Sequence, residues 1–132
     1  MIEFHLDTHS GVAPYLQIAQ QVKQALRLGV LEVGDQLPTV REAVAQMAVN
    51  PNTVLKAYRE LEHEGLAASR PGQGTFVQRT LGGAGLSSHA ALKRSLGRWL
   101  HSARAAGLEE ESILALFLST FQDTRIEEED TA

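Results

Sequence analysis

Two helix-start signals near the middle of the chain constrain its fold more than any other feature of the sequence. Thr39-Val40-Arg41-Glu42 has the form of a capping box, in which the threonine and glutamate side chains satisfy unpaired backbone N–H groups at a helix start. Asn50 is a favourable N-cap, and Pro51 occupies the first helical position, where a missing N–H costs nothing. The first helix must therefore stop near Ala48, and the second follows after a very short turn. This arrangement indicates a helix-turn-helix.

The segments on either side of this pair fit the same motif. Pro14 begins a pattern in which apolar residues recur every three or four positions, as in an amphipathic helix, and Gly29 is a suitable end for it. After Gly65 the pattern predicts two short strands, residues 66–69 and 75–78, joined by a turn rich in proline and glycine. We expect this hairpin to be a wing. Residues 4–7, which precede the helix predicted from Pro14, could form a short strand or an arm.

The sequence beyond the wing predicts a second, smaller unit. The glycine-rich segment 82–85 is typical of a flexible linker. A helix follows, Gly107 ends it, and the acidic run 109–111 favours the start of another. We expect the acidic tail from Glu127 onward to be frayed. The predicted fold is therefore mainly α with a small β-wing: a winged helix-turn-helix over residues 1–80, followed by a linker and a C-terminal helical hairpin over residues 81–132.

The last helix carries more apolar side chains than one helical partner can cover. They are Ile113, Leu114, Leu116, Phe117, Leu118 and Phe121. On a helical wheel they spread over roughly 200°, wider than a single amphipathic stripe. The preceding helix has a narrower apolar face, in which Trp99 is better explained by packing than by ligand stacking. A second subunit should therefore bury the remainder, and the predicted dimerisation residues are Leu92, Leu96, Trp99, Ile113, Leu114, Phe117, Leu118 and Phe121.

The helix that begins at Pro51 has a polar face opposite its apolar one. If Val54, Ala57, Tyr58 and Leu61 face the core, the wheel places four polar residues on the outer side. These residues are Asn52, Lys56, Arg59 and His63. Asparagine can read adenine, and lysine or arginine can reach guanine or phosphate in a major groove. An ordinary solvated face would look the same, but the short preceding turn and the wing favour DNA.

Two further elements are candidates for DNA contact. Arg41 lies in the first turn of the preceding helix, the end that faces DNA in this motif, although a surface ion pair with Glu42 or Glu62 would also explain it. In the wing turn, Gly72 and Gly74 permit close backbone approach and Arg70 adds charge. A hairpin turn that simply needs glycine is the alternative there.

Composition and spacing argue against other classes of protein. A net charge of −4 is unlike that of a non-specific DNA coater, and the sequence has no cysteine. His5 and His9 are four apart, but in a segment that we expect to be extended, so we predict no metal and no cofactor. No constellation supports an enzyme. Without a signal sequence or a long apolar run, we expect a cytoplasmic protein without a membrane span.

Several blocks of the sequence together resemble the GntR family of bacterial regulators. They run in the family's order from residue 14 to residue 77: Pro14–Ile18, Gly34–Glu42, Val49–Val54, Ala57–Glu62 and Gly72–Val77. Thr39 stands where the family more often has serine, which keeps the capping hydroxyl. The segment after residue 80 is too short for the larger effector domains, and a helical hairpin there is similar to the YtrA-like subgroup.

The resemblance implies a homodimer that binds an inverted-repeat operator and represses an operon, often one that encodes an ABC transporter. By motif position it implies DNA contacts at Thr39, Arg41, Asn50, Pro51, Asn52, Thr53, Lys56, Gln73 and Gly74. To these the residue pattern adds Arg59, Arg70 and Gly72. A winged helix reused for protein interaction, without DNA binding, is the alternative. The sequence identifies no effector, although one is possible, and it does not decide between repression and activation.

Overall fold

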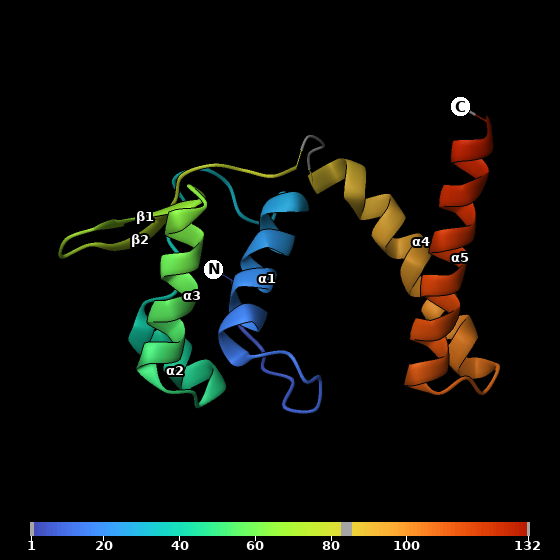
Figure 1. Cartoon of the computed structure of the whole chain (residues 1–132), viewed down its shortest axis with the longest axis horizontal. Helices are drawn as coiled ribbons and strands as arrows, with labels where there is room; N and C mark the ends of the chain where they lie inside the picture. The colour runs from blue at the N-terminus through green and yellow to red at the C-terminus, as the bar shows by residue number, and fades with distance from the viewer. Residues whose placement is uncertain (1, 83–85, 132) are drawn as a thin grey trace. The chain divides into compact units, whose positions relative to one another are not determined.

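The computed structural model describes residues 2–82 and 86–131, and within these ranges it is mostly helical (Figure 1). Its elements are α1 (Pro14–Arg27), α2 (Val40–Met47), α3 (Pro51–His63), β1 (Ala67–Arg70), β2 (Gly74–Val77), α4 (Leu86–Ala105) and α5 (Glu110–Thr131). The chain forms two compact units, residues 1–89 and 90–132. The predicted fold class is confirmed, whereas most of the predicted linker, residues 83–85, lies outside the described residues.

Local capping forms the pair of helices that the sequence predicts. The Thr39 side chain accepts a hydrogen bond from the Glu42 N–H at 3.1 Å, and the Glu42 carboxylate accepts one from the Thr39 N–H at 3.3 Å. Ala48 ends α2 in the left-handed conformation, with φ of 55°. The Asn50 side chain then caps α3 by accepting the Asn52 N–H at 2.8 Å. The predicted helix-turn-helix is therefore confirmed.

The core of the first unit lies between α1, α2 and α3. The apolar face of α3 is buried, as predicted, and comprises Val54, Ala57, Tyr58 and Leu61. The Tyr58 hydroxyl donates a hydrogen bond to the backbone carbonyl of Pro38, which ties the segment before α2 to α3. Burial, with a smaller effect of the nearby Glu42 carboxylate, raises the pKa of Tyr58. This phenol therefore stays a neutral hydrogen-bond donor at physiological pH.

Residues 4–7 form an arm, not a strand. Glutamine side chains of α1 supply the hydrogen bonds that a neighbouring strand would give: Gln21 accepts from the His5 N–H at 2.9 Å and donates to the His5 carbonyl at 2.7 Å. Gln17 pairs with the backbone of Asp7 in the same way. Phe4 is buried in the core. The arm thus closes one side of the first unit.

The wing is a two-stranded antiparallel hairpin with Ala67 opposite Val77 and Arg70 opposite Gly74. Both strands lie within one residue of the predicted positions. The segment before α2 extends this sheet, since the Leu37 N–H donates to the Thr75 carbonyl at 2.9 Å and the Val77 N–H to the Asp35 carbonyl at 2.8 Å. The base of the wing is therefore joined directly to the start of the helix-turn-helix.

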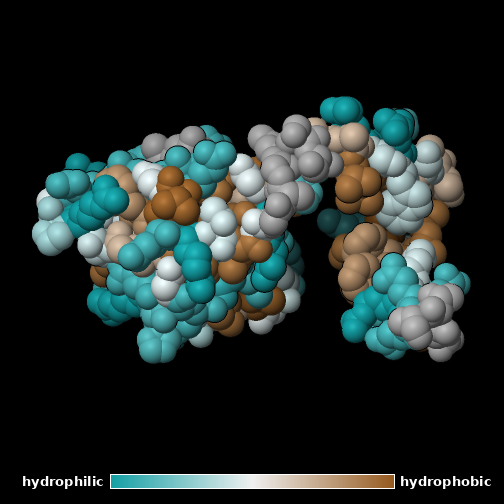
Figure 2. All heavy atoms as spheres, turned by 90° about the horizontal axis from the view of Figure 1, so that it is seen from above, coloured by the Kyte–Doolittle hydropathy of each residue, from teal (hydrophilic) through white to brown (hydrophobic). Residues whose placement is uncertain are grey.

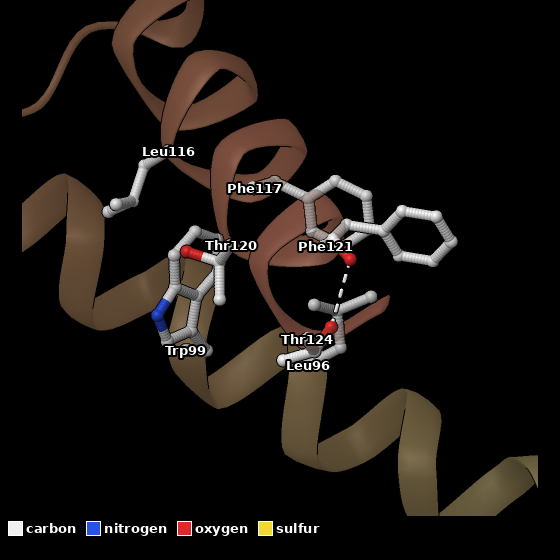
Figure 3. Close-up of a pocket in the computed structure, with 7 residues that line it drawn as sticks. All are labelled: Leu96, Trp99, Leu116, Phe117, Thr120, Phe121 and Thr124. Carbon is white, nitrogen blue, oxygen red and sulfur yellow. Dashed lines mark hydrogen bonds between the residues drawn. The ribbon is translucent and has the colours of Figure 1, made fainter. Parts of the chain in front are cut away.

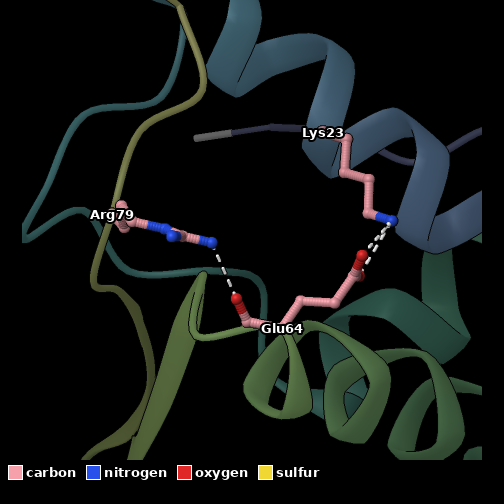
Figure 4. Close-up of polar contacts among 3 residues, drawn as sticks. All are labelled: Lys23, Glu64 and Arg79. Atoms are coloured by element: carbon pink, nitrogen blue, oxygen red, sulfur yellow. Dashed lines mark hydrogen bonds and ion pairs between the residues drawn. The ribbon is translucent and has the colours of Figure 1, made fainter.

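Charged groups hold the C-terminal end of α3 against α1 and the chain that follows the wing (Figure 4). The Lys23 ammonium of α1 lies 2.8 Å from the Glu64 carboxylate, and Arg79 donates to the Glu64 backbone carbonyl at 2.8 Å. A cation at this carbonyl also compensates the helix dipole. Because the ion pair is partly exposed, its contribution to stability is at most about 1 kcal/mol.

In the second unit, α4 and α5 form the predicted hairpin, and Gly107 makes the turn with φ of 90° (Figure 1). Ala103 and Ile113 are buried within it. The expectation of a frayed tail from Glu127 is wrong, because α5 continues to Thr131. Its sequence contains no glycine or proline, and glutamate is a good helix former. Within the described ranges, no helix has the length and apolar character needed to cross a bilayer.

Candidate nucleic-acid interface

The outer face of α3 presents the polar residues that the helical wheel places there. Asn52, Lys56, Arg59 and His63 are all exposed, on the side opposite the buried apolar face. No salt bridge involves any of them within the described part of the chain. Their donors are therefore available to a partner such as the edge of a base or a phosphate.

Lys56 makes a contact with another helix that the sequence does not reveal. Its ammonium lies over the ring of Tyr15, in the first turn of α1, 4.0 Å from the ring centroid. This cation–π contact links the lysine to the first turn of α1 and leaves the side chain exposed. A lysine restrained in this way loses less side-chain entropy when it binds a phosphate.

The first turn of α2 carries a second exposed cation. Arg41 is exposed and forms no ion pair among the described residues. The two carboxylates considered as ion-pair partners of Arg41 form other hydrogen bonds. Glu42 closes the capping box, and Glu62 accepts a hydrogen bond from the Ser69 hydroxyl. The structure thus gives no support to the ion-pair interpretation of Arg41. Thr39 is exposed at the same helix start.

The start of α3 has the features of a phosphate-binding helix terminus. Asn50, Pro51 and Asn52 are exposed, and Thr53 is half-buried one turn before Lys56. The Asn50 side-chain oxygen is used by the cap, which leaves its NH2 group for a partner. The positive end of the helix dipole would favour a phosphate here.

The wing turn is held by contacts that only the three-dimensional structure shows. The Arg70 guanidinium lies 4.2 Å from the centroid of the Phe76 ring on the opposite strand. Gly72 and Gly74 have φ of 73° and 123°, values that L-residues rarely adopt, so the turn requires both glycines. Gln73 is exposed between them, and its carbonyl accepts a hydrogen bond from the Gln36 side chain at 3.0 Å. Sequence reasoning did not identify Gln36.

An apolar groove runs between the two helices of the second unit (Figure 3). It has a volume of about 260 Å3, and its lining includes Leu96 and Trp99 of α4 and Phe117 and Phe121 of α5. The two phenylalanine rings are stacked, with centroids 6.1 Å apart. Hydrophobic patches also lie on the surface of this unit among polar ones (Figure 2). The exposed large hydrophobic residues of α4 and α5 are Leu92, Leu96, Leu114, Leu116, Phe117, Leu118, Phe121 and Ile126. Ile113 is instead buried inside the hairpin.

The first unit is therefore a winged helix-turn-helix, a class of fold that many DNA-binding regulators use. Residues 14–77 match the family of bacterial regulatory proteins named gntR. The HTH-type transcriptional repressor YtrA of Bacillus subtilis is 36% identical over 109 residues, which cover 82% of this chain and 84% of that protein. The chain belongs to the GntR family and is a DNA-binding transcriptional regulator, not an enzyme.

The solved structures that are similar to this one include the following two. A transcriptional antiterminator from Listeria monocytogenes EGD-e matches with a TM-score of 0.57 and 31% identity, covering 92% of each chain. AraR(DBD), solved in complex with operator ORX1, matches 58% of this chain and 99% of its own length with a TM-score of 0.53 and 26% identity. The predicted resemblance to GntR regulators of the YtrA type is confirmed, and these findings do not favour a winged helix used only for protein interaction.

Proposed function

We propose that this chain is a homodimeric repressor that binds an operator made of two inverted half-sites. The observation that carries the proposal is the exposed outer face of α3, where Asn52, Lys56 and Arg59 lie opposite the buried apolar face and form no ion pair among the described residues. The proposed contacts are Thr39, Arg41, Asn50, Pro51, Asn52, Thr53, Lys56, Arg59, Arg70, Gly72, Gln73 and Gly74. His63, farther along α3, is an additional candidate.

These contacts divide by chemistry. Arg41, Asn52 and Arg59 carry forked donors or amides that suit base edges in the major groove. Lys56 is a point charge, and we assign it to a phosphate. In the wing, Arg70 and the glycine-rich turn suit the backbone or the minor groove, where close approach matters more than side-chain size.

The surface of the second unit supports the dimer. Leu92 is 70% exposed, and Leu114 and Leu118 are each 56% exposed. Large contiguous apolar patches on a monomeric protein are usually interaction surfaces. A second copy of the same hairpin would bury the proposed dimerisation residues, namely Leu92, Leu96, Trp99, Leu114, Phe117, Leu118 and Phe121. Ile113 is buried within its own hairpin and would pack against these residues instead of contacting the second copy.

Two-fold symmetry then fixes the form of the operator. Two copies of α3 on one side of the dimer would enter successive major grooves about 34–36 Å apart, which requires an inverted repeat.

The YtrA-like character of the chain supports an operon that encodes an ABC transporter as the regulated target, and a cytoplasmic location for the regulator. We assign residues 1–80 to the DNA-binding domain and residues 81–132 to the linker and the dimerisation hairpin.

A binding titration tests the proposal. Fluorescence anisotropy should show saturable binding to the DNA upstream of the regulator's own gene, retained in excess unrelated DNA. A scrambled fragment of equal length and base composition is the control. Equal affinity for the two fragments would contradict sequence-specific operator recognition.

A further inference from the structure

The segment before α2 pairs with the outer edge of β2 through a short backbone bridge, and Pro38 ends this pairing. Gly34, Asp35 and Leu37 exchange backbone hydrogen bonds with β2, and Gln36 lies opposite Phe76 in this register. Proline has no N–H to donate, and the chain turns at this point into the cap of α2. The backbone hydrogen bonds between this segment and β2 therefore hold the base of the wing but do not reach its turn.

The side chain of Gln36 continues this pairing to the wing turn. Its Nε2 donates to the Gln73 carbonyl at 3.0 Å. Gly74 leaves the space for it, because a Cβ on that residue would lie 2.6 Å from the Gln36 Nε2. Two independent features therefore favour glycine at position 74: its positive φ and the space that the Gln36 amide occupies beside it.

The backbone that follows Gln36 is held in the core. Leu37, the next residue, is almost fully buried, and the Pro38 carbonyl accepts the hydrogen bond of Tyr58. Thr39 then caps α2, whose first turn carries Arg41. The Gln36 side chain therefore connects the wing turn to a rigid point three residues from the cap of α2.

We propose that Gln36 is a positioning residue that fixes the wing turn relative to the first turn of α2, so that both reach the operator in one orientation. This inference rests on the proposed function. Arg70 belongs to the same arrangement, since its guanidinium rests on Phe76, the residue opposite Gln36. Gln36 itself acts through these neighbours and needs no contact with DNA.

Two variants of the full-length protein test the role of Gln36. Gln36→Ala removes the donor, and Gln36→Glu keeps the size but places an acceptor against the Gln73 carbonyl. Losing one such hydrogen bond should weaken operator binding about threefold to tenfold. Gln36→Glu should weaken it at least as much. Gln24→Ala, an exposed glutamine on α1, is the matched control and should bind as the parent does.

A double-mutant cycle separates positioning from a general effect on folding. If Gln36 acts through the wing, Gln36→Ala should cost less than about twofold in an Arg70→Ala background, because the wing contact is already lost. Full additivity, or unchanged affinity in both Gln36 variants while the parent binds its operator, would overturn the inference alone. A parent protein with no preference for its operator would overturn the proposed function, and the role of Gln36 with it.

Discussion

Arg41 and Lys56 are both exposed cations, yet their surroundings differ, and we propose a different task for each. Arg41 stands at a helix start without an ion pair among the described residues, so its fork can approach a base edge. Lys56 lies on the ring of Tyr15 as a restrained point charge. At the scale of single residues, readout and electrostatic attraction are therefore separable by mutation.

Arg41→Ala should weaken operator binding by about 1–3 kcal/mol and leave binding to unrelated DNA almost unchanged, because a base contact is lost. Anisotropy titrations with both DNAs measure this difference. Arg27→Ala, in the last turn of α1, is a matched loss of one arginine away from the proposed surface. Equal losses on both DNAs would assign Arg41 to a phosphate.

Lys56→Ala should weaken binding to operator and unrelated DNA alike, and it should reduce the slope of log K against log salt by about one. The measurement is a set of titrations at several salt concentrations, again with Arg27→Ala as the control. A loss confined to the operator, with an unchanged salt slope, would mean that Lys56 reads a base.

At the scale of elements, the short turn between α2 and α3 is held in a strained conformation. Ala48 has φ of 55°, in the left-handed region that glycine adopts readily and alanine does not. Ala48→Gly should therefore raise the free energy of unfolding by about 0.5–1 kcal/mol. Ala45→Gly, at an exposed position inside α2, should lower it by about 1 kcal/mol. Denaturant unfolding measures both, and a loss of stability in Ala48→Gly would contradict the strain.

The elements of this fold are predictable from the sequence where the signals are local. The capping box at Thr39, the cap at Asn50 and the glycines of the wing turn act over a few residues and gave helices and strands close to those observed. The outer face of α3 followed from helical periodicity alone.

Contacts between distant residues were not predictable. Gln36 meets Gln73 across 37 residues, and Lys56 meets Tyr15 of another helix. Nothing in their local sequence specifies these pairs, because tertiary packing creates them. The arm at residues 4–7 was ambiguous for the same reason, since glutamine side chains of α1 replace the partner strand. The burial of Ile113 likewise depends on how α4 and α5 pack.

At the scale of the whole molecule, the exposed apolar surface of α4 and α5 predicts self-association. The protein should sediment as a dimer at micromolar concentration without DNA. Leu118→Glu places a charge in that surface and should shift the equilibrium toward monomer, with a parallel loss of operator affinity, because one half-site must then act alone. Ser119→Glu, at an exposed polar position of α5 outside the proposed dimerisation residues, should leave the dimer intact. A monomeric parent protein would contradict this assembly.

Footprinting on the DNA upstream of the regulator's gene tests the central claim most directly, because it examines recognition and symmetry together. We predict two protected half-sites of inverted sequence, with centres about one helical turn apart or a near multiple of it. Protection should disappear from both half-sites in Arg41→Ala at concentrations where the parent protein protects fully. A single protected site without an inverted partner, or protection without sequence preference, would contradict the account.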